Sequence, residues 1–297
     1  MRIVNTAEFG IGIQREDGVV DVSSIFEDIP YRTEIDRVPR ILGVFNDRKD
    51  QVASLAESAD VAPAATLLAP VPRPPKIVAA LRNYFEGVER ERDELDMFLK
   101  SPDSVLAPGG TVVLPPHKAS IFHHEAELGV VIGKRSKDLP ADERAYEALL
   151  GYTCVMDISG RDLGRMPPSR IGKSFSTFTP LGPAIVTPDE ISDPQALTIK
   201  LPVKGPLRQQ YDTSDMEYSV IECLAFLSSY MTLVPGDVIL LGTNHQGLGP
   251  VQHDDTVTME IDQVGKLEVN VVDDLRRTCP YEIDEAAALR AREQRLA

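Results

Sequence analysis

The sequence lacks the features that mark several large classes of protein. It has no Walker phosphate loop and no Gly-x-Gly-x-x-Gly segment, so we expect no nucleotide cofactor. Its apolar runs all fall short of the about 20 residues that a helix needs to span a bilayer. The first residues, MRIVNTAEFGIGIQ, lack the charged leader and apolar core of a signal peptide. These absences predict a soluble, cytoplasmic protein.

Cysteine and positive charge are also scarce. The chain has three cysteines, Cys154, Cys223 and Cys279, which are widely spaced and form no Cys-x-x-Cys pair, so we expect reduced thiols. Lysine and arginine total 31 against 46 aspartates and glutamates, which gives a formal net charge of −15. Because no basic patch offsets this charge, we expect neither nucleic acid nor an anionic membrane as a partner.

The length and a proline-rich stretch suggest how the chain is organised. Its 297 residues are enough for one large domain or about two ordinary ones. Strand-like segments, followed by helical patterns near residues 34–45 and 48–57, predict a small N-terminal α/β domain over residues 1–68. Four prolines then lie between residues 70 and 75, where they exclude a helix interior and a sheet centre. This stretch is a stiff connector or a boundary, and residues 69–297 are predicted to form a second domain.

From residue 105 onward the chain is rich in short segments typical of β-strands. Turn residues separate these segments, which read TVVLP, AELGVVIG, GYTCVMDIS, LGPAIVT, LTIKLPV, DVILLGT, VTMEI and LEVNVVDD. One helix is predicted within residues 214–231, beginning at the capping-box pattern Ser214-x-x-Glu217. The densely charged residues 86–98 are predicted to be an exposed helix or a solvated loop. The pattern predicts a mixed α/β, β-rich fold with a closed or rolled sheet.

Two carboxylates open one of these strands, in the segment HHEAELGVVIGKR. Residues i and i+2 of a strand point to the same side, so Glu125 and Glu127 face one way and the alternating apolar residues face the other. Their charges, about 6.7 Å apart along the strand, repel unless a cation lies between them. The pair is therefore either part of a solvated strand face or part of a metal site.

A third carboxylate, Asp157, lies at the end of another predicted strand. Three carboxylates at the ends of two adjacent strands form an oxygen-only set that suits Mg²⁺, Mn²⁺ or Ca²⁺, with positions open for a substrate. Zinc fits less well, because no cysteine or histidine cluster has the usual ligand spacing. His123 shares the face of Glu125 and Glu127, where it is either a ligand or base or a packed, hydrogen-bonded residue.

These segments resemble those of the fumarylacetoacetate hydrolase superfamily. The resemblance covers roughly residues 68–272 and rests on the segments APVPRPPKIVAALRNY, MFLKSPDSVLAPG, HHEAELGVVIGK, MDISGRD, GKSFSTFTPLGP, YDTSDMEYSV, LVPGDVILLGT and GLGP. It implies a β-roll catalytic domain, a homodimer and a bound Mg²⁺ or similar ion. It also implies a 2-oxo or 1,3-dioxo carboxylic acid substrate that undergoes C–C hydrolysis, decarboxylation, hydration or keto–enol isomerisation.

The resemblance also implies roles for single residues. The metal ligands of the family fall on Glu125, Glu127 and Asp157. Lys173 matches a lysine that stabilises negative charge on the substrate, and it is predicted to be catalytic. The remaining matches are predicted substrate-binding residues: Arg161 with Asp162 to orient it, Thr243, and the amide of Gly242.

The sequence departs from the family pattern at the residues that normally activate water. Gly87 stands where many family hydrolases carry a lid histidine, and Gly164 stands where glutamine is frequent. Nearby Glu89 or Glu91 is either a substitute base or a solvated lid charge, and His245 is a candidate replacement acid or base or else a structural or substrate contact. Two residues of the same region are predicted to bind substrate: Arg82, an unusual cation that could bind a second carboxylate, and Tyr84.

Together these features predict a divalent-metal-dependent hydrolase. It is expected to cleave a C–C bond of an acylpyruvate or other 1,3-dioxo carboxylic acid through a metal-stabilised enolate. Because Gly87 replaces the lid histidine, a lyase or isomerase of the same family is the alternative: a 2-oxo acid decarboxylase, a hydratase or a keto–enol tautomerase. The alternative outside enzymes is a calcium-binding structural module. Mg²⁺ is the expected cofactor, with Mn²⁺ or Ca²⁺ as substitutes.

Overall fold

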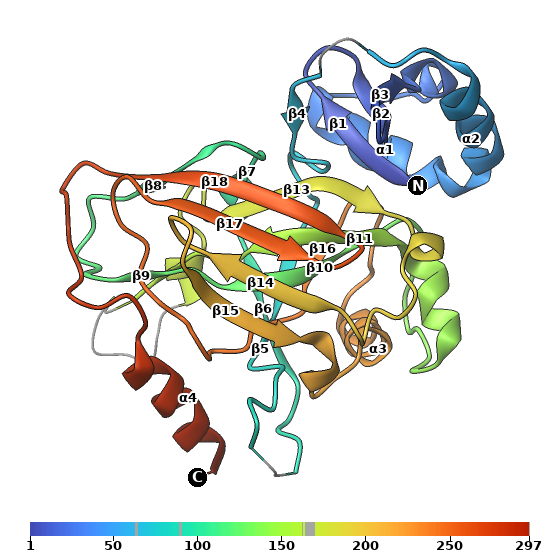
Figure 1. The fold of residues 1–297 in the computed structure, drawn as a ribbon. Helices are drawn as coiled ribbons and strands as arrows, with labels where there is room; N and C mark the ends of the chain where they lie inside the picture. Colours follow the sequence, from blue (N-terminus) through green and yellow to red (C-terminus); the bar gives the residue numbers. More distant parts are fainter. Residues whose placement is uncertain (63–64, 89–90, 162, 164–169, 297) are drawn as a thin grey trace.

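Two β-sheets dominate the computed structural model, which describes residues 1–62, 65–88, 91–161, 163 and 170–296. The larger sheet has eleven strands in the order β3-β2-β1-β13-β11-β10-β16-β5-β6, with β4 paired to β1 and β7 paired to β13 (Figure 1). Its strands are β1 (Arg2–Thr6), β2 (Gly10–Arg15), β3 (Gly18–Asp21), β4 (Leu67–Leu68), β5 (Ile77–Leu81), β6 (Asp96–Lys100), β7 (Val105–Leu106), β10 (Ala126–Ile132), β11 (Leu149–Met156), β13 (Thr179–Val186) and β16 (Val238–Leu240).

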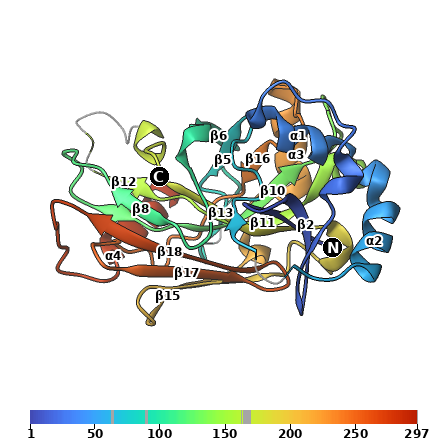
Figure 2. The same ribbon diagram turned by 90° about the horizontal axis from the view of Figure 1, so that it is seen from above.

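The second sheet has five strands in the order β15-β14-β17-β18-β8, and a two-stranded ribbon joins β12 to β9. These strands are β8 (Thr111–Leu114), β9 (Phe122–His123), β12 (Ser159–Gly160), β14 (Thr198–Pro202), β15 (Leu207–Asp212), β17 (Thr256–Ile261) and β18 (Gly265–Asp273). Strand β11 packs against β17 and β18, so the sheets roll around a shared core (Figure 2). The prediction of a β-rich α/β fold is confirmed.

Four α-helices and several short 3-10 helices complete the described part of the chain. The α-helices are α1 (Glu34–Val44), α2 (Lys49–Ser58), α3 (Val220–Tyr230) and α4 (Glu285–Leu296). The 3-10 helices are η1 (Ser23–Phe26), η2 (Asn46–Arg48), η3 (Pro102–Ser104), η4 (Glu143–Ala148), η5 (Arg170–Lys173), η6 (Pro188–Glu190) and η7 (Thr213–Asp215). Across the described residues, no helix has the length and apolar character that crossing a membrane requires.

Strand β10 is the central element for the arrangement described below. All its residues are buried, and the alternating Ala126, Leu128, Val130 and Ile132 pack in one hydrophobic cluster while Val131 packs in another. A strand covered on both faces has a nearly continuous apolar sequence, as β10 does after Glu127. Its antiparallel partners are β11 on one side and β16 on the other, so the ends of three strands meet at one edge.

The N-terminal segment shares a sheet and a core with the rest of the chain. Strand β1 pairs with β13, and Phe45 and Val52 of the segment belong to the same hydrophobic cluster as Val131 and Leu181. The two helices predicted near residues 34–45 and 48–57 are confirmed as α1 and α2. The division into domains at residue 68 stays a prediction.

The predicted start of the third helix, at Ser214, was wrong, because the helix begins after the second of two capping-box patterns. Ser-x-x-Glu occurs twice here, and the capping box of α3 is formed by Ser219 and Glu222, while Ser214 lies in η7. The apolar residues Val220, Cys223, Leu224 and Leu227 follow Ser219 at helical spacing and are buried, which favours the later start. Glu217 instead accepts a hydrogen bond from the Asp93 amide at 3.2 Å.

In its described residues, 86–88 and 91–98, the charged segment forms no helix, and only part of it is a loop. Its last residues enter β6, which pairs with β5, and the residues 91–95 before it have no regular structure. Strand β6 ends at Lys100, whose side chain is completely buried. The sequence pattern concealed this strand, because its exposed and buried residues alternate within a charged context.

Candidate active site

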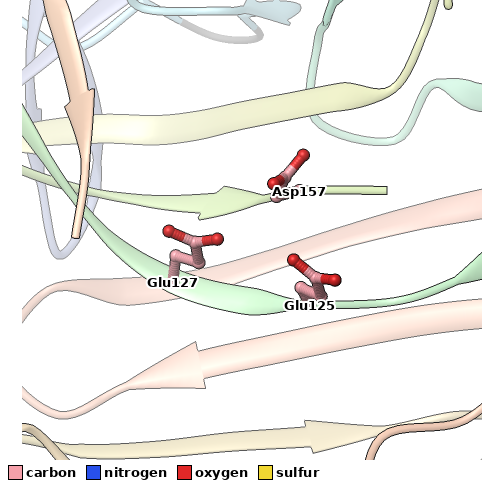
Figure 3. A group of neighbouring side chains, drawn as sticks. All are labelled: Glu125, Glu127 and Asp157. Atoms are coloured by element: carbon pink, nitrogen blue, oxygen red, sulfur yellow. The ribbon is translucent and has the colours of Figure 1, made fainter. Parts of the chain in front are cut away.

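Three buried carboxylates converge at the edge where β10 and β11 meet. Glu125 precedes β10, Glu127 lies within it, and Asp157 directly follows β11 (Figure 3). The strand register and the hydrogen bond from the Asp157 amide to the Glu125 carbonyl, 2.9 Å long, hold the three together. One oxygen of each lies within 4.8 Å of the others, and the residues are 4%, 2% and 1% exposed respectively. The interpretation as a solvated strand face is therefore wrong.

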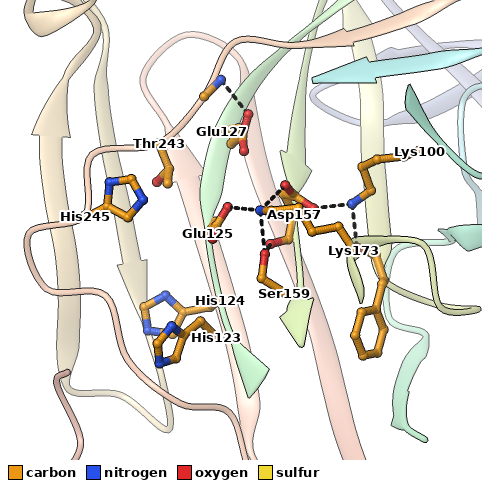
Figure 4. A network of polar contacts seen from close by, with 12 residues as sticks. Lys100, His123, His124, Glu125, Glu127, Asp157, Ser159, Lys173, Thr243 and His245 are labelled. Carbon is orange, nitrogen blue, oxygen red and sulfur yellow. Dashed lines mark hydrogen bonds and ion pairs between the residues drawn. The ribbon is translucent and has the colours of Figure 1, made fainter. Parts of the chain in front are cut away.

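Three cations surround the carboxylates, and Figure 4 shows two of them, Lys100 and Lys173. The Lys173 ammonium of η5 donates to Glu125 Oε2, Asp157 Oδ2 and Ser159 Oγ, each at 2.6 Å. The buried Lys100 ammonium contacts Asp157 Oδ1 and donates to the Phe178 carbonyl at 3.1 Å. The Arg161 guanidinium contacts Glu125 Oε1. The structure thus places Lys173 and Arg161 beside the carboxylates, while their roles toward a substrate stay predictions; Lys100 was not predicted.

The charges compensate the three carboxylates unequally. Burial opposes ionisation of Glu125, but the Lys173 and Arg161 charges hold its pKa well below the usual value. Burial, followed by the negative charges of Asp157 and Glu125, raises the pKa of Glu127 well above the usual value. Within the described residues no cation pairs directly with Glu127, whose Oε2 accepts only the Gly242 amide, at 2.6 Å. A buried carboxylate in this position calls for a further positive charge.

The donor set fits a hard divalent cation. All three groups are carboxylates, which Mg²⁺, Mn²⁺ and Ca²⁺ prefer over nitrogen or sulfur ligands. Burial disfavours the charged form of Lys173, but the negative charges of Asp157 and Glu125 raise its pKa, so Lys173 stays a cation beside the carboxylates. Lys100 differs, because burial and the Lys173 charge lower its pKa despite Asp157.

The Gly242–Thr243 loop forms a second wall of the site. Gly242 has a φ of 87° and its amide binds the Glu127 carboxylate, so its predicted role toward a substrate stays a prediction. Thr243 is buried, and its Oγ1 accepts from Gln209 Nε2 and shares a hydrogen bond with the Tyr211 hydroxyl, both at 3.1 Å. Gln209 also holds His124, with 3.0 Å between Oε1 and Nδ1, and was not predicted.

The other two predicted substrate-binding residues, Tyr84 and Arg82, differ in their surroundings. Tyr84 is completely buried in the hydrophobic cluster, edge-on to Tyr211 with ring centres 5.1 Å apart, so it supports the residue that holds Thr243. Arg82 is partly exposed with a φ of 55°, and among the described residues it makes no ion pair with the site. Substrate binding by Arg82 and Tyr84 stays a prediction.

His245 does lie beside the site, next to Thr243 (Figure 4). Its ring Nδ1 is 2.6 Å from Oε1 of Glu86, a completely buried residue that the sequence analysis did not single out. Gly87 follows with a φ of 71°, and Glu91 is exposed. Glu89, Asp162 and Gly164 lie outside the described residues.

His123 is buried and connects Arg161 to the C-terminal helix. Its Nδ1 accepts from Arg161 Nε at 3.1 Å, and its Nε2 lies 3.2 Å from Oδ2 of Asp284, the residue before α4. Burial, and then the Arg161 charge, lowers the pKa of His123 to about 2, so the imidazole is neutral. Of the two interpretations of His123, these contacts favour the packed, hydrogen-bonded residue. Asp284 was not predicted, because no local pattern links it to residue 123.

The family model for the fumarylacetoacetate (FAA) hydrolase C-terminal domain matches residues 76–272. Among relatives in sequence, an uncharacterised protein of Pyrococcus horikoshii is 40% identical over 67% of this chain and 89% of its own length. Oxaloacetate tautomerase FAHD2B of Bos taurus, a mitochondrial protein, is 38% identical over 70% of this chain and 69% of its own.

Solved structures are similar over nearly the whole chain. Maleylpyruvate hydrolase from Sphingobium sp. SYK-6 superposes with a TM-score of 0.80 and 32% identity, covering 92% of this chain and 100% of that one. A second structure of that hydrolase, in complex with manganese(II) ion and pyruvate, matches with the same TM-score and identity. On these matches, the chain belongs to the fumarylacetoacetate hydrolase family.

Proposed function

We propose that the protein is a divalent-metal-dependent hydrolase that cleaves the C–C bond of an acylpyruvate. The observation that carries the proposal is the buried set of Glu125, Glu127 and Asp157, with oxygens within 4.8 Å and the Lys173 ammonium between two of them. The similarity to a hydrolase of maleylpyruvate, one of whose structures contains manganese(II) and pyruvate, supports the same reading.

Glu125, Glu127 and Asp157 would hold the ion, with Mg²⁺ proposed first and Mn²⁺ or Ca²⁺ as substitutes. When bound, such an ion supplies Lewis-acid polarisation of the 2-oxo acid. Arg161 binds the substrate carboxylate: its Nε and Nη2 contact His123 and Glu125, and its Nη1 protons belong to neither contact. The Thr243 hydroxyl lies on the side of Glu125 and Glu127 away from Lys173 (Figure 4), and it orients the same acid.

The chain's own residues then provide charge and proton transfer. The Lys173 ammonium stabilises negative charge that develops on the keto oxygen as the C–C bond breaks. A water molecule adds to the acyl carbonyl, giving up a proton to a base, and the bond between this carbon and C3 of the pyruvate unit breaks. The products are a carboxylic acid and the enolate of pyruvate, which takes a proton at C3. His245 is the residue that we assign to these proton transfers.

The second candidate is keto–enol tautomerisation of oxaloacetate. Relatives that are 38% and 37% identical over 70% of this chain are described as oxaloacetate tautomerases. The same ion-binding carboxylates and Lys173 serve this reaction, which moves a proton between carbon and oxygen and adds no water. Tautomerisation therefore requires a base that reaches the substrate carbon, but it does not require that base to activate water.

A direct assay separates these candidates. Metal-stripped protein is given Mg²⁺, Mn²⁺, Ca²⁺ or no ion, and acetylpyruvate or oxaloacetate is then added. The proposal expects acetate and pyruvate in equal amounts, only with an ion, and unchanged rates in the control Glu147→Gln, whose carboxylate lies in an exposed ion pair. Loss of oxaloacetate enol absorbance without acetylpyruvate cleavage would favour the tautomerase. Thermal stabilisation by Ca²⁺ without any turnover would favour the structural module.

Asp284 provides a test of how Arg161 is held. Replacement of Asp284 by alanine removes the carboxylate near His123 and the hydrogen bond from the Ala287 amide, 2.8 Å long, which caps α4. We expect KM for acetylpyruvate to rise about fivefold, the equivalent of one hydrogen bond of ~1 kcal/mol, with little change in kcat. Asp284→Asn keeps an acceptor at the same position and should restore most of the affinity. Equal KM values in all three proteins would contradict a positioning role.

A further inference from the structure

A histidine and a carboxylate meet beside the site from two distant segments. Glu86 Oε1 lies 2.6 Å from the Nδ1 of His245, and the same oxygen accepts the backbone N–H of His245 at 3.1 Å. The Glu86 side chain is completely buried, whereas that of His245 is 18% exposed. The ring is thus fixed at one nitrogen and keeps access to the side of Thr243 and Glu125 (Figure 4).

Several further hydrogen bonds fasten the two segments to each other. One oxygen of Asp215 accepts both the Glu86 amide and the Asn244 side-chain amide, each at 3.0 Å. The Gln246 side chain donates to the Glu86 carbonyl, also at 3.0 Å. Glu86 adopts a φ of 57°, a left-handed conformation that costs free energy in a residue other than glycine. The surrounding contacts hold Glu86 in this conformation with its carboxylate at the His245 ring.

The contact fixes the tautomer of the imidazole. Because Oε1 already accepts the His245 backbone proton, it acts as an acceptor, and Nδ1 is then the ring nitrogen that carries a proton. The other nitrogen, Nε2, keeps its lone pair and can take a proton. A carboxylate on Nδ1 also stabilises the imidazolium that forms when Nε2 is protonated.

We propose that Glu86 is a positioning residue that makes His245 the base of this enzyme. The proposal rests on the function proposed above and names the residues that activate water in it. Such residues are needed because Gly87 stands at the position where many family hydrolases carry the histidine base. His245 Nε2 takes a proton from water as the oxygen adds to the acyl carbon. After the C–C bond has broken, the imidazolium returns that proton to C3 of the pyruvate enolate. The reaction consumes one water molecule and leaves the histidine unchanged.

Steady-state kinetics tests the proposal with matched variants. With Mg²⁺ and acetylpyruvate, Glu86→Gln and His245→Gln are expected to lower kcat about a hundredfold, the usual range for a lost general base, and to change KM less than threefold. Glu147→Gln should leave both constants unchanged. Circular dichroism and Mn²⁺ affinity verify that each variant is folded with an intact ion site. A folded Glu86→Gln or His245→Gln protein with the kcat of the unmodified enzyme would overturn the proposal.

A second measurement requires neither turnover nor metal. In the ¹⁵N-labelled, metal-free protein, the His245 ring should show a proton on Nδ1 and none on Nε2. Glu86→Gln should shift this signal or abolish it. A His245 ring with its proton on Nε2 in the unmodified protein would overturn the proposal, whatever the fate of the variants.

Deuterium exchange separates this proposal from the hydrolase assignment. Exchange of the C3 protons of pyruvate in D₂O requires a base but no C–C cleavage. If the unmodified protein exchanges pyruvate without cleaving acylpyruvates, and His245→Gln loses the exchange, the hydrolase assignment fails and the base assignment stands. If the unmodified protein and the His245 variant cleave and exchange equally, the base assignment fails and the hydrolase stands.

Discussion

Replacing Glu127 with glutamine is expected to abolish Mg²⁺ binding and turnover while making the metal-free protein more stable. Glu127 is 2% exposed, and in the described part of the chain its carboxylate accepts a hydrogen bond from the Gly242 amide and forms no direct ion pair. Loss of a direct ligand should cost more than the about 10–100-fold in affinity that outer hydrogen-bond partners of a metal contribute. Without metal, the same change removes a buried charge and leaves a polar group of the same shape.

The stability effect should grow with pH. The pKa of Glu127 is raised from its usual 4.5, first by burial and then by Asp157 and Glu125. An acid with a raised folded-state pKa contributes stability below pH 4.5 that is lost as pH rises through the folded value. In the metal-free protein, the melting temperature of Glu127→Gln should therefore exceed that of the unmodified protein by more at pH 7.5 than at pH 5.

The size of the difference and the response to metal are both measurable. We expect a few degrees at pH 7.5, since ~1 kcal/mol shifts the melting temperature of a domain of this size by about 2–4 °C. Added Mg²⁺ should raise the melting temperature of the unmodified protein and leave that of Glu127→Gln unchanged. A variant that melts lower than the unmodified protein without metal, and is stabilised by Mg²⁺, would contradict this account of the site.

Replacing Lys173 with methionine should separate turnover from metal binding. The Lys173 ammonium makes three contacts of 2.6 Å, two of them to proposed metal ligands. We expect kcat to fall about 10²–10³-fold, the usual result of removing one group that stabilises an oxyanion. Affinity for Mg²⁺ should persist or rise, because the change removes a cation beside Glu125 and Asp157.

A lysine elsewhere provides the control for this variant. Lys134 forms an exposed ion pair with Glu147, and Lys134→Met should change neither kcat nor metal affinity. Metal-free Lys173→Met should also be less stable, because two buried carboxylates lose their shared partner, and Mg²⁺ should restore part of that loss. Unchanged kcat in Lys173→Met would show that the ammonium has no part in the reaction.

The core of the site could be predicted from the sequence because its determinants are local. The two-residue period of a strand places Glu125 and Glu127 on one side, and Asp157 follows the neighbouring antiparallel strand. Arg161 lies five residues beyond the end of β11 and Lys173 lies 17 residues beyond it, both in segments that resemble the family. Burial of the carboxylates could not be read from the sequence, since it depends on β16 and on the loop that follows it.

The residues that were missed reach the site through contacts between distant parts of the chain. Lys100 approaches Asp157 from the end of β6, whose first residues were predicted to be part of an exposed helix or a solvated loop. Glu86 and His245 are 159 positions apart in the sequence. Glu86 directly precedes Gly87, the position at which many family hydrolases carry a histidine, and no local pattern marks Glu86 itself as a site residue. A local pattern identifies which residues can do chemistry, but only the topology of the sheets shows which of them meet.

Binding of Mn²⁺ to the metal-free protein, measured by calorimetry with and without pyruvate, tests the central claim most directly. The unmodified chain should bind a single ion, and pyruvate should bind tightly only after that ion. Combined replacement of Glu125 and Glu127 by glutamine and of Asp157 by asparagine should remove both events. If the triple variant takes up Mn²⁺ and pyruvate with unchanged affinity, these carboxylates do not form the metal site and the proposed function fails.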